Sequence, residues 1–330
     1  MRIFITGGTG YIGTRLAEKL AVQGNEVVIL ARDPDKCIKL DNVTFVKGDI
    51  LDAAALKKGM TGCELVFHMA AFTKPWSKDR TLPYKTNVTG TKNVIEAAIG
   101  TGIRKIVITS TGGTMGWSRH GMAVDESTNK LKEFHTEYER TKAEAENMAI
   151  EYSRNGIDIS IVNPTRVYGP GIISKTNILT FIIQKYLAGK WRIMPGNGKS
   201  IGHYVFVDDV VDGHILAGKS GRSGERYILG GENLSFIEIA EIISEESGIR
   251  RKLFPFPFRA VKFLIGISTV YSHVFRVAPF LPGEWVEKYS KDWIISSDKA
   301  VTELGYRITP FRTGVAETIR WIKTKQSKNG

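Results

Sequence analysis

A glycine-rich stretch near the start of the chain, residues 6–13, constrains the fold more than any other feature. It follows an apolar run typical of a buried strand and precedes residues 15–22, whose apolar stripe is typical of a helix. Glycine lets the backbone approach a pyrophosphate, and the first N–H groups of the helix face the anion. The strand, loop and helix together predict a dinucleotide site. The expected contacts are Gly7, Gly10, Tyr11, Ile12 and Gly13.

Strands and helices alternate along the first half of the chain. Further strands are expected at 26–31, 43–46, 64–69, 105–109 and 158–162, and helices at 52–59, 87–99 and 138–154. This order predicts an α/β fold with a doubly wound parallel sheet of Rossmann type. Beyond about residue 169, Pro and Gly interrupt the alternation. We therefore expect a dinucleotide-binding domain over 1–170, to which about 203–232 returns, and a smaller C-terminal substrate-binding lobe over most of 171–330.

Composition limits the classes of function. The chain has 330 residues, 42% of them hydrophobic, and a net charge of +12 that is scattered rather than gathered in blocks, so nucleic acid is not an expected partner. Cys37 and Cys63 have no disulfide or metal-ligand spacing, which predicts no metal site and fits a reducing cytoplasm. The chain opens directly on a strand, so we expect no signal peptide, and no apolar run approaches the ~20 residues of a membrane span.

The end of the second strand indicates which dinucleotide binds. Arg32 stands about 20 residues past the glycines, where a guanidinium suits the phosphate of NADP, and Lys36 adds a second cation. We therefore expect NADP, while Asp33 keeps NAD open as the alternative because a carboxylate there would bind the ribose. After the third strand, Asp49 either binds the adenine amine or caps the next helix. After the fourth strand, the small Ala70 and Ala71 let the cofactor pass, whereas His68 is expected to be packed and hydrogen-bonded.

Tyr138 and Lys142 lie four residues apart on the helix expected at 138–154, so they share one face. An ammonium beside a phenol favours the phenolate and lowers its pKa from ~10, which makes the phenol a usable acid or base. The alternative is a solvated helix pair. The strand before this helix ends in the hydroxyl-rich stretch 109–116, where Thr111 or Ser110 could hold a substrate oxygen unless these groups serve turn formation.

Over essentially its whole length the chain resembles an extended short-chain dehydrogenase/reductase. The matching landmarks, in order, are 7–13, Asp49 with Ile50, 68–71, Asn87, 109–116, Tyr138 with Lys142, Asn163 with Pro164, and 207–209. The resemblance implies that Tyr138 is the general acid/base, that Lys142 holds the nicotinamide ribose, and that Thr111 orients the substrate, with Ser110 as second choice. It also implies a homodimer. Further cofactor contacts expected from the landmarks are Ile50, Asn87, Thr109, Tyr138, Lys142 and Pro164.

Departures from the family's subgroups narrow the expected activity. Gly112-Gly113 stands where sugar-nucleotide dehydratases carry Asp-Glu, and Arg166 where sugar-nucleotide epimerases carry Asn. The chain looks closer to the branch with dihydroflavonol 4-reductase, 3-beta-hydroxysteroid dehydrogenase-like and hopanoid-associated epimerase-like proteins. That resemblance implies an NADP(H)-dependent oxidoreductase that interconverts a ketone and a secondary alcohol on a bulky, partly apolar substrate. The alternatives are an NAD-dependent nucleotide-sugar epimerase and a non-catalytic dinucleotide-sensing protein.

The second half contributes candidate substrate contacts and one unusual helix. The candidate contacts, each with core packing as the alternative, are Trp76, Met115, Trp117, Arg166, Tyr168 and His203. Within 253–282 the polar positions recur every three or four residues on an otherwise apolar helix, and they are Arg259, Lys262, Gly266, Thr269, His273 and Arg276. We favour a helix packed in the small lobe with this stripe in water. The alternatives are a lid over a lipid-like substrate and a weak membrane-surface contact through 258–277.

Overall fold

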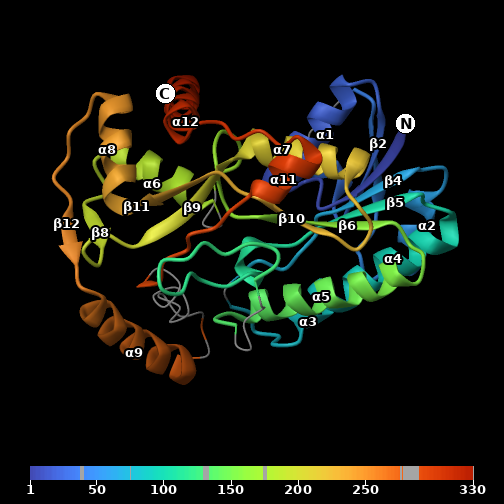
Figure 1. Cartoon of the computed structure of the whole chain (residues 1–330), viewed down its shortest axis with the longest axis horizontal. Coiled ribbons are helices and arrows are strands. Elements are labelled where there is room, and N and C mark those ends of the chain that lie inside the picture. Colours follow the sequence, from blue (N-terminus) through green and yellow to red (C-terminus); the bar gives the residue numbers. More distant parts are fainter. Residues whose placement is uncertain are drawn as a thin grey trace.

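Seven parallel strands form the large sheet, in the order β10-β6-β5-β4-β1-β2-β3 (Figure 1). The computed structural model describes residues 1–37, 41–74, 76–128, 134–173, 177–275, 277 and 290–329. The strands are β1 (Arg2–Thr6), β2 (Glu26–Ala31), β3 (Val43–Lys47), β4 (Leu65–His68), β5 (Lys105–Thr109), β6 (Ile159–Pro164) and β10 (Arg226–Leu229). The expected Rossmann-type sheet is confirmed.

Helices cover both faces of this sheet because its strands are apolar on both sides. In β1, Ile3 and Ile5 point to one face and Phe4 to the other, so the alternation of side chains divides the core in two. One face is covered by α1 (Tyr11–Val22), α7 (Val207–Ser220) and α11 (Asp298–Leu304). The other is covered by α2 (Ala53–Met60), α4 (Gly90–Thr101) and α5 (Glu137–Arg154). The helix expected at 87–99 begins as a π-helical turn, Lys85–Thr89, and continues as α4.

The smaller lobe is built from two small sheets and three helices. Its sheets are β11-β9-β7, with β7 (Arg166–Tyr168), β9 (Ile201–Phe206) and β11 (Glu232–Ser235), and β12-β8, with β8 (Ile193–Pro195) and β12 (Phe254–Phe256). Residues of α6 (Ile178–Leu187), α8 (Phe236–Ser247) and α12 (Phe311–Asn329) fill its core. Within the segment 203–232, α7 and β10 lie with the large sheet, whereas β9 lies in the lobe.

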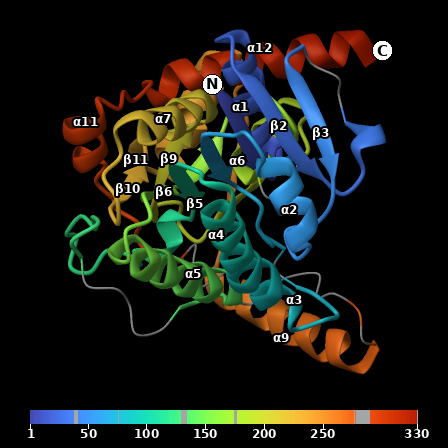
Figure 2. The same ribbon diagram turned by 90° about the vertical axis from the view of Figure 1, so that its right-hand side faces the viewer.

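Helix α9 (Phe258–Phe275) follows β12 and forms an outer edge of the molecule in two perpendicular views (Figures 1 and 2). Of the polar stripe predicted here, Arg259 and Gly266 are exposed, and the side chains of residues 262, 269, 273 and 276 lie outside the described part. Apolar side chains of α9 are exposed as well, whereas a helix packed in the lobe with only its polar stripe in water would bury them. In the described ranges, no helix is both long and apolar enough to cross a membrane.

Candidate active site

The loop between β1 and α1 is packed so closely that only glycine fits at two positions. Gly7 has a φ of +73°, and a Cβ there would lie 2.6 Å from the backbone nitrogen of Ala70. A Cβ on Gly13 would lie 2.2 Å from the Gly7 carbonyl oxygen. Gly10 precedes α1 without a side-chain cap, and the first turn of the helix, which is fully described, has no acidic residue. These features fit a dinucleotide pyrophosphate at the helix N-terminus.

Tyr11 and Ile12 hold this loop in place. The Tyr11 hydroxyl donates to the carbonyl oxygen of Gly169 (2.9 Å), and its ring lies so close to Gly171 that a Cβ there would be at 2.7 Å. Burial raises the pKa of the Tyr11 phenol well above its usual value. Ile12 is half-buried and packs on the core of the large sheet. The loop is thus fixed against both the sheet and the segment that follows β7.

Residues expected to bind the adenosine end follow β2 and β3. Arg32 is exposed and stands directly after β2, while Lys36 ends a short 3₁₀ turn and its side chain lies outside the described part. Asp49 accepts the backbone N–H of Leu51 (3.0 Å), and the cap of α2 is Asp52 instead. The helix-cap alternative for Asp49 is therefore wrong. The Ile50 side chain is buried against Gly90, where a Cβ would lie 2.5 Å from it.

Two expected cofactor contacts have their polar atoms engaged inside the protein. Asn87 accepts the Phe72 N–H (2.7 Å) and donates to the Phe72 carbonyl oxygen (3.3 Å) and to Thr141 (2.9 Å). Asn87 thereby ties the segment that holds Ala70 and Ala71, which are half-buried, to α5. The Thr109 hydroxyl hydrogen-bonds His214 (2.9 Å). The Asn87 and Thr109 side chains thus bond to the protein's own groups, and their contact with the cofactor stays a prediction.

His68 is packed and hydrogen-bonded, as the sequence predicts. Its ring nitrogens bond Thr6 (2.7 Å) and Thr91 (2.9 Å), and the side chain is fully buried. Burial, with a smaller contribution from the cation Lys142, lowers the pKa of His68 to about 3. The imidazole is therefore neutral across the physiological range.

Helix α5 aligns three ionisable side chains at intervals of one turn, Tyr138, Lys142 and Glu146. Burial, with smaller contributions from Glu139 and Glu146, raises the pKa of the half-buried Tyr138 to about 12 against the opposing effect of the hydrogen bond with Thr111. Lys142 is 1% exposed, and burial lowers its pKa to about 8 against the attraction of Glu146. The expectation that Lys142 lowers the pKa of Tyr138 is corrected: desolvation of the phenolate dominates. Both groups are protonated at neutral pH.

The sequence analysis missed a buried polar cluster around Glu146, which is 1% exposed. Its Oε1 accepts hydrogen bonds from Ser110 (2.5 Å), Thr114 (2.7 Å) and the amide of Asn163 (2.7 Å). Its Oε2 lies 3.7 Å from the Arg226 guanidinium. The cluster joins the ends of β5 and β6 to α5, and the spacing of Glu146 four residues after Lys142 was its one sequence signal. Because Ser110 donates to Glu146, Thr111 is the hydroxyl that reaches Tyr138.

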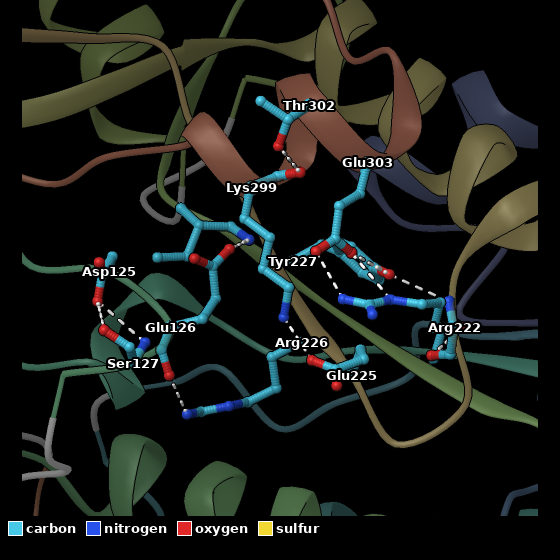
Figure 3. Close-up of polar contacts among 12 residues, drawn as sticks. Asp125, Glu126, Ser127, Arg222, Glu225, Arg226, Tyr227, Lys299, Thr302 and Glu303 are labelled. Atoms are coloured by element: carbon cyan, nitrogen blue, oxygen red, sulfur yellow. Dashed lines mark hydrogen bonds and ion pairs between the residues drawn. The ribbon is translucent and has the colours of Figure 1, made fainter.

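Arg226 also holds the loop after β5 to the edge of the large sheet. Its guanidinium donates to the Glu126 carbonyl oxygen (2.6 Å), and the Glu126 carboxylate accepts the Ile228 N–H (2.6 Å), as Figure 3 shows. Burial raises the pKa of that carboxyl group. These bonds cover β10, an edge strand whose backbone groups would otherwise face outward. They also tie Glu126, in the segment after β5, to this edge of the sheet.

Three of the candidate substrate contacts are core residues, so those predictions are corrected. Met115 is buried in a cluster with Trp293, and its sulfur lies 3.5 Å from Arg226. Tyr168 is buried in the lobe and donates to the Phe311 carbonyl oxygen (3.1 Å). His203 is buried and bonds the Gly231 carbonyl oxygen (3.0 Å), and burial lowers its pKa to about 4. In each case the alternative of core packing is the one observed.

The other three candidates keep part of their surface accessible. Trp117 stacks on the His135 ring at a centroid distance of 4.3 Å, with the Lys291 ammonium 5.6 Å from the Trp117 ring. Arg166 follows β6, its guanidinium lying 5.4 Å from the Tyr204 ring centroid and donating to the Tyr204 hydroxyl (3.1 Å). Trp76, after β4, is half-buried. Pro164 ends β6, the strand that precedes Arg166.

A family model, NAD dependent epimerase/dehydratase family, matches residues 3–230. The chain belongs to this family. It is therefore an enzyme of the extended short-chain dehydrogenase/reductase type, an oxidoreductase whose relatives are NAD(P)-dependent reductases, dehydrogenases and epimerases. The family shows neither the substrate nor a preference between NAD and NADP.

Curated relatives match the chain over nearly its whole length. It is 32% identical to a putative dihydroflavonol 4-reductase of Synechocystis, covering 97% of this chain and 94% of that protein. It is 28% identical to sterol demethylase protein B of Methylococcus capsulatus, covering 98% and 99%. It is 29% identical to a 4-hydroxy-2-methyl-3-oxo-4-farnesyl-3,4-dihydroquinoline-1-oxide ketoreductase of Stigmatella aurantiaca, covering 93% and 92%. The crystal structure of gox2253 superposes with a TM-score of 0.82 at 29% identity, covering 98% of both chains.

Proposed function

We propose that this enzyme is an NADP(H)-dependent oxidoreductase that interconverts a ketone and a secondary alcohol on a bulky, partly apolar substrate. The observation that carries the proposal is the protonated Tyr138 phenol, hydrogen-bonded with Thr111 at the end of β5 and one turn from the buried ammonium of Lys142. This edge of a parallel sheet is where ligands of such folds bind. A general acid and a hydroxyl that orients a carbonyl oxygen are the groups that reduction of a ketone requires.

Each residue of the site has a distinct role in this proposal. The bound nicotinamide dinucleotide supplies or accepts the hydride at the substrate carbon. Tyr138 donates its proton to the oxygen during reduction and takes it back during oxidation. Thr111 accepts the Gly113 N–H at its own oxygen (3.2 Å), and its hydroxyl hydrogen, which is bonded to Tyr138 in the free enzyme, would donate to the substrate oxygen when the substrate binds. Lys142 holds a positive charge near that oxygen and stabilises it as negative charge develops.

The cofactor contacts proposed are the glycine loop, the residues that follow β2 and β3, and the backbone beyond β4. We favour NADP because Arg32 is exposed directly after β2 and a guanidinium can bind a phosphate in bidentate fashion. Arg32→Ala is expected to weaken NADPH binding at least about tenfold and to leave NADH binding unchanged. Isothermal titration calorimetry with NADPH and NADH measures both affinities. Equal losses of affinity for the two cofactors would refute the proposed preference for NADP.

The substrate is proposed to be bulky because Trp117, Trp76 and Arg166 keep accessible surface beside the site. Two relatives point in the same direction, since one is named for a farnesylated quinoline oxide and the other for a sterol. A panel of cyclic and prenylated ketones with NADPH is the corresponding assay. Nucleotide-linked sugars, which are polar and anionic, serve as the comparison set.

Tyr138→Phe tests the proposed acid. This variant should bind NADPH with unchanged affinity and lose ketone turnover by at least about a hundredfold, since it removes one proton and little else. Tyr152→Phe is the matched control, because Tyr152 lies on the same helix and its hydroxyl donates to Glu96 at the surface. Retained turnover in Tyr138→Phe would refute the assignment. Native mass spectrometry that finds tightly bound NAD, with no net cofactor consumption, would favour the epimerase alternative.

A further inference from the structure

Helix α9 carries an exposed apolar stripe, which we define as Phe263, Ile267, Tyr271 and Phe275. These residues are spaced by four, so they follow one side of the helix. Phe263 is 72% exposed and Phe275 is 60% exposed. The rings of Tyr271 and Phe275 lie 4.6 Å apart between centroids, so the end of the stripe forms a continuous surface.

A neighbouring side of α9, next to the Phe275 end of the stripe, attaches the helix to the protein. Ser268 is fully buried, and Val261 and Ile265 are half-buried. At the start of the helix the Phe258 ring packs so closely on Gly196 that a Cβ there would lie 2.4 Å away. Both views show α9 along the outer edge of the molecule, on the same side as α5 (Figures 1 and 2). A row of exposed apolar side chains on an attached helix marks an interaction surface.

The chain around the exposed apolar stripe is strongly cationic. Residues 247–283 contain no Asp or Glu and six Lys or Arg, which equals half of the net charge of +12. These residues are Arg250, Arg251, Lys252, Arg259, Lys262 and Arg276. Arg259 is exposed and precedes Phe263 by one turn. Arg259 therefore places an exposed cation on the helix that carries the apolar stripe, in a stretch of sequence that has no acidic residue.

We propose that the exposed apolar stripe of α9 docks on the surface of a lipid bilayer that contains anionic lipids. The apolar side chains would enter the boundary between headgroups and acyl chains, and the cations would contact the anionic headgroups. A second copy of the chain fits this surface less well, because a twofold contact would bring the same cations together. The proposal concerns lipid binding and stands apart from ketone turnover.

Co-sedimentation of the full chain with vesicles tests the proposal. Vesicles of phosphatidylcholine with about a third phosphatidylglycerol should retain the protein at low salt, and both high salt and pure phosphatidylcholine should weaken the binding. The double variant Phe263→Ser/Phe275→Ser should lower the vesicle partition coefficient by at least about tenfold. Arg259→Ala should lower it by about fivefold.

Val22→Ser is the matched control, since Val22 is 89% exposed on α1, on a different part of the surface. It should bind vesicles as the natural chain does, and all variants should keep the circular dichroism spectrum and the NADPH affinity of the natural chain. Failure of the natural chain to bind anionic vesicles would overturn the proposal. So would light scattering that shows a dimer which only the double variant dissociates, because the stripe would then bind a second copy.

Discussion

Removing the carboxylate of Glu146 should destabilise the protein strongly, although Glu146 is not one of the residues proposed to act on the substrate. The carboxylate is 1% exposed, and one of its oxygens accepts hydrogen bonds from Ser110, Thr114 and Asn163. Its other oxygen lies 3.7 Å from the Arg226 guanidinium. Glu146→Ala therefore removes one buried charge and leaves its partners to find other acceptors.

The size of the loss in stability depends on which hydrogen bonds the partners of Glu146 keep in the Glu146→Ala variant. The Asn163 amide keeps the Thr111 carbonyl oxygen (3.1 Å), and Thr114 keeps the same oxygen (2.8 Å). Among the hydrogen bonds of the described residues, the Ser110 hydroxyl donates to Glu146 alone. One hydroxyl left without an acceptor and one ion pair broken in the interior should together cost about 3–5 kcal/mol of unfolding free energy.

Urea unfolding of Glu146→Ala, followed by circular dichroism, measures this loss as a lower midpoint at unchanged m. Glu144→Ala is the control on the same helix, because the Glu144 side chain is 41% exposed and pairs with Arg140 at the surface (3.0 Å). That variant should lose no more than about 0.5 kcal/mol. A loss below about 1 kcal/mol in Glu146→Ala would refute the claim that the cluster holds the strand ends to α5.

Three further variants or conditions test other parts of the site. Burial lowers the pKa of Lys142, and the negative charge of Glu146 partly offsets this effect. Glu146→Gln removes that charge, so the pKa of Lys142 should fall below about 8 and the alkaline limb of kcat/KM should move to lower pH. Gly13→Ala should weaken NADPH binding at least about tenfold, because its Cβ would lie 2.2 Å from the Gly7 carbonyl oxygen. Gly100→Ala should bind normally, because its Cβ would make only an ordinary contact with the Lys57 side chain at 3.8 Å. Acid should unfold the protein through three buried histidines, His68, His203 and His214, whose pKa values burial lowers to about 3, 4 and 4. The unfolded chain binds these protons near pH ~6.5, so stability is full above that pH and falls by up to about 3 kcal/mol per histidine toward pH ~4, as urea midpoints at stepped pH would show.

Local patterns in the sequence predicted the sheet well because they depend on neighbours along the chain. The expected strands at 26–31 and 105–109 have the observed bounds of β2 and β5, and the glycine loop lies between β1 and α1. Polar partners that come from distant segments were not predictable in this way. Glu146 meets Asn163 and Arg226 only after β6 and β10 have joined the sheet, so its spacing after Lys142 does not by itself identify the cluster.

The candidate pocket residues show the same limit. Tyr168 and His203 stand beside recognisable motifs, yet both are in the core because the lobe folds back over them with Phe311 and Gly231. The positions of these residues in the sequence predicted which motifs they lie near, but not the direction in which their side chains point. The exposed apolar stripe of α9 is the reverse case: an apolar pattern that usually indicates burial lies at the surface, because no described segment covers that side.

The protonation state of Tyr138 leads to a last prediction about the direction of catalysis. With its pKa raised to about 12, the phenol is protonated at neutral pH and is already in the form that donates a proton to a reduced carbonyl oxygen. Oxidation of the alcohol needs the phenolate, whose population rises about tenfold per pH unit below the pKa. Alcohol oxidation should therefore rise from neutral pH to about pH 8 while ketone reduction stays level, and both should be limited above about pH 8, where Lys142 loses its proton. Initial rates in both directions between neutral and alkaline pH measure this contrast. Parallel profiles would mean that another group transfers the proton.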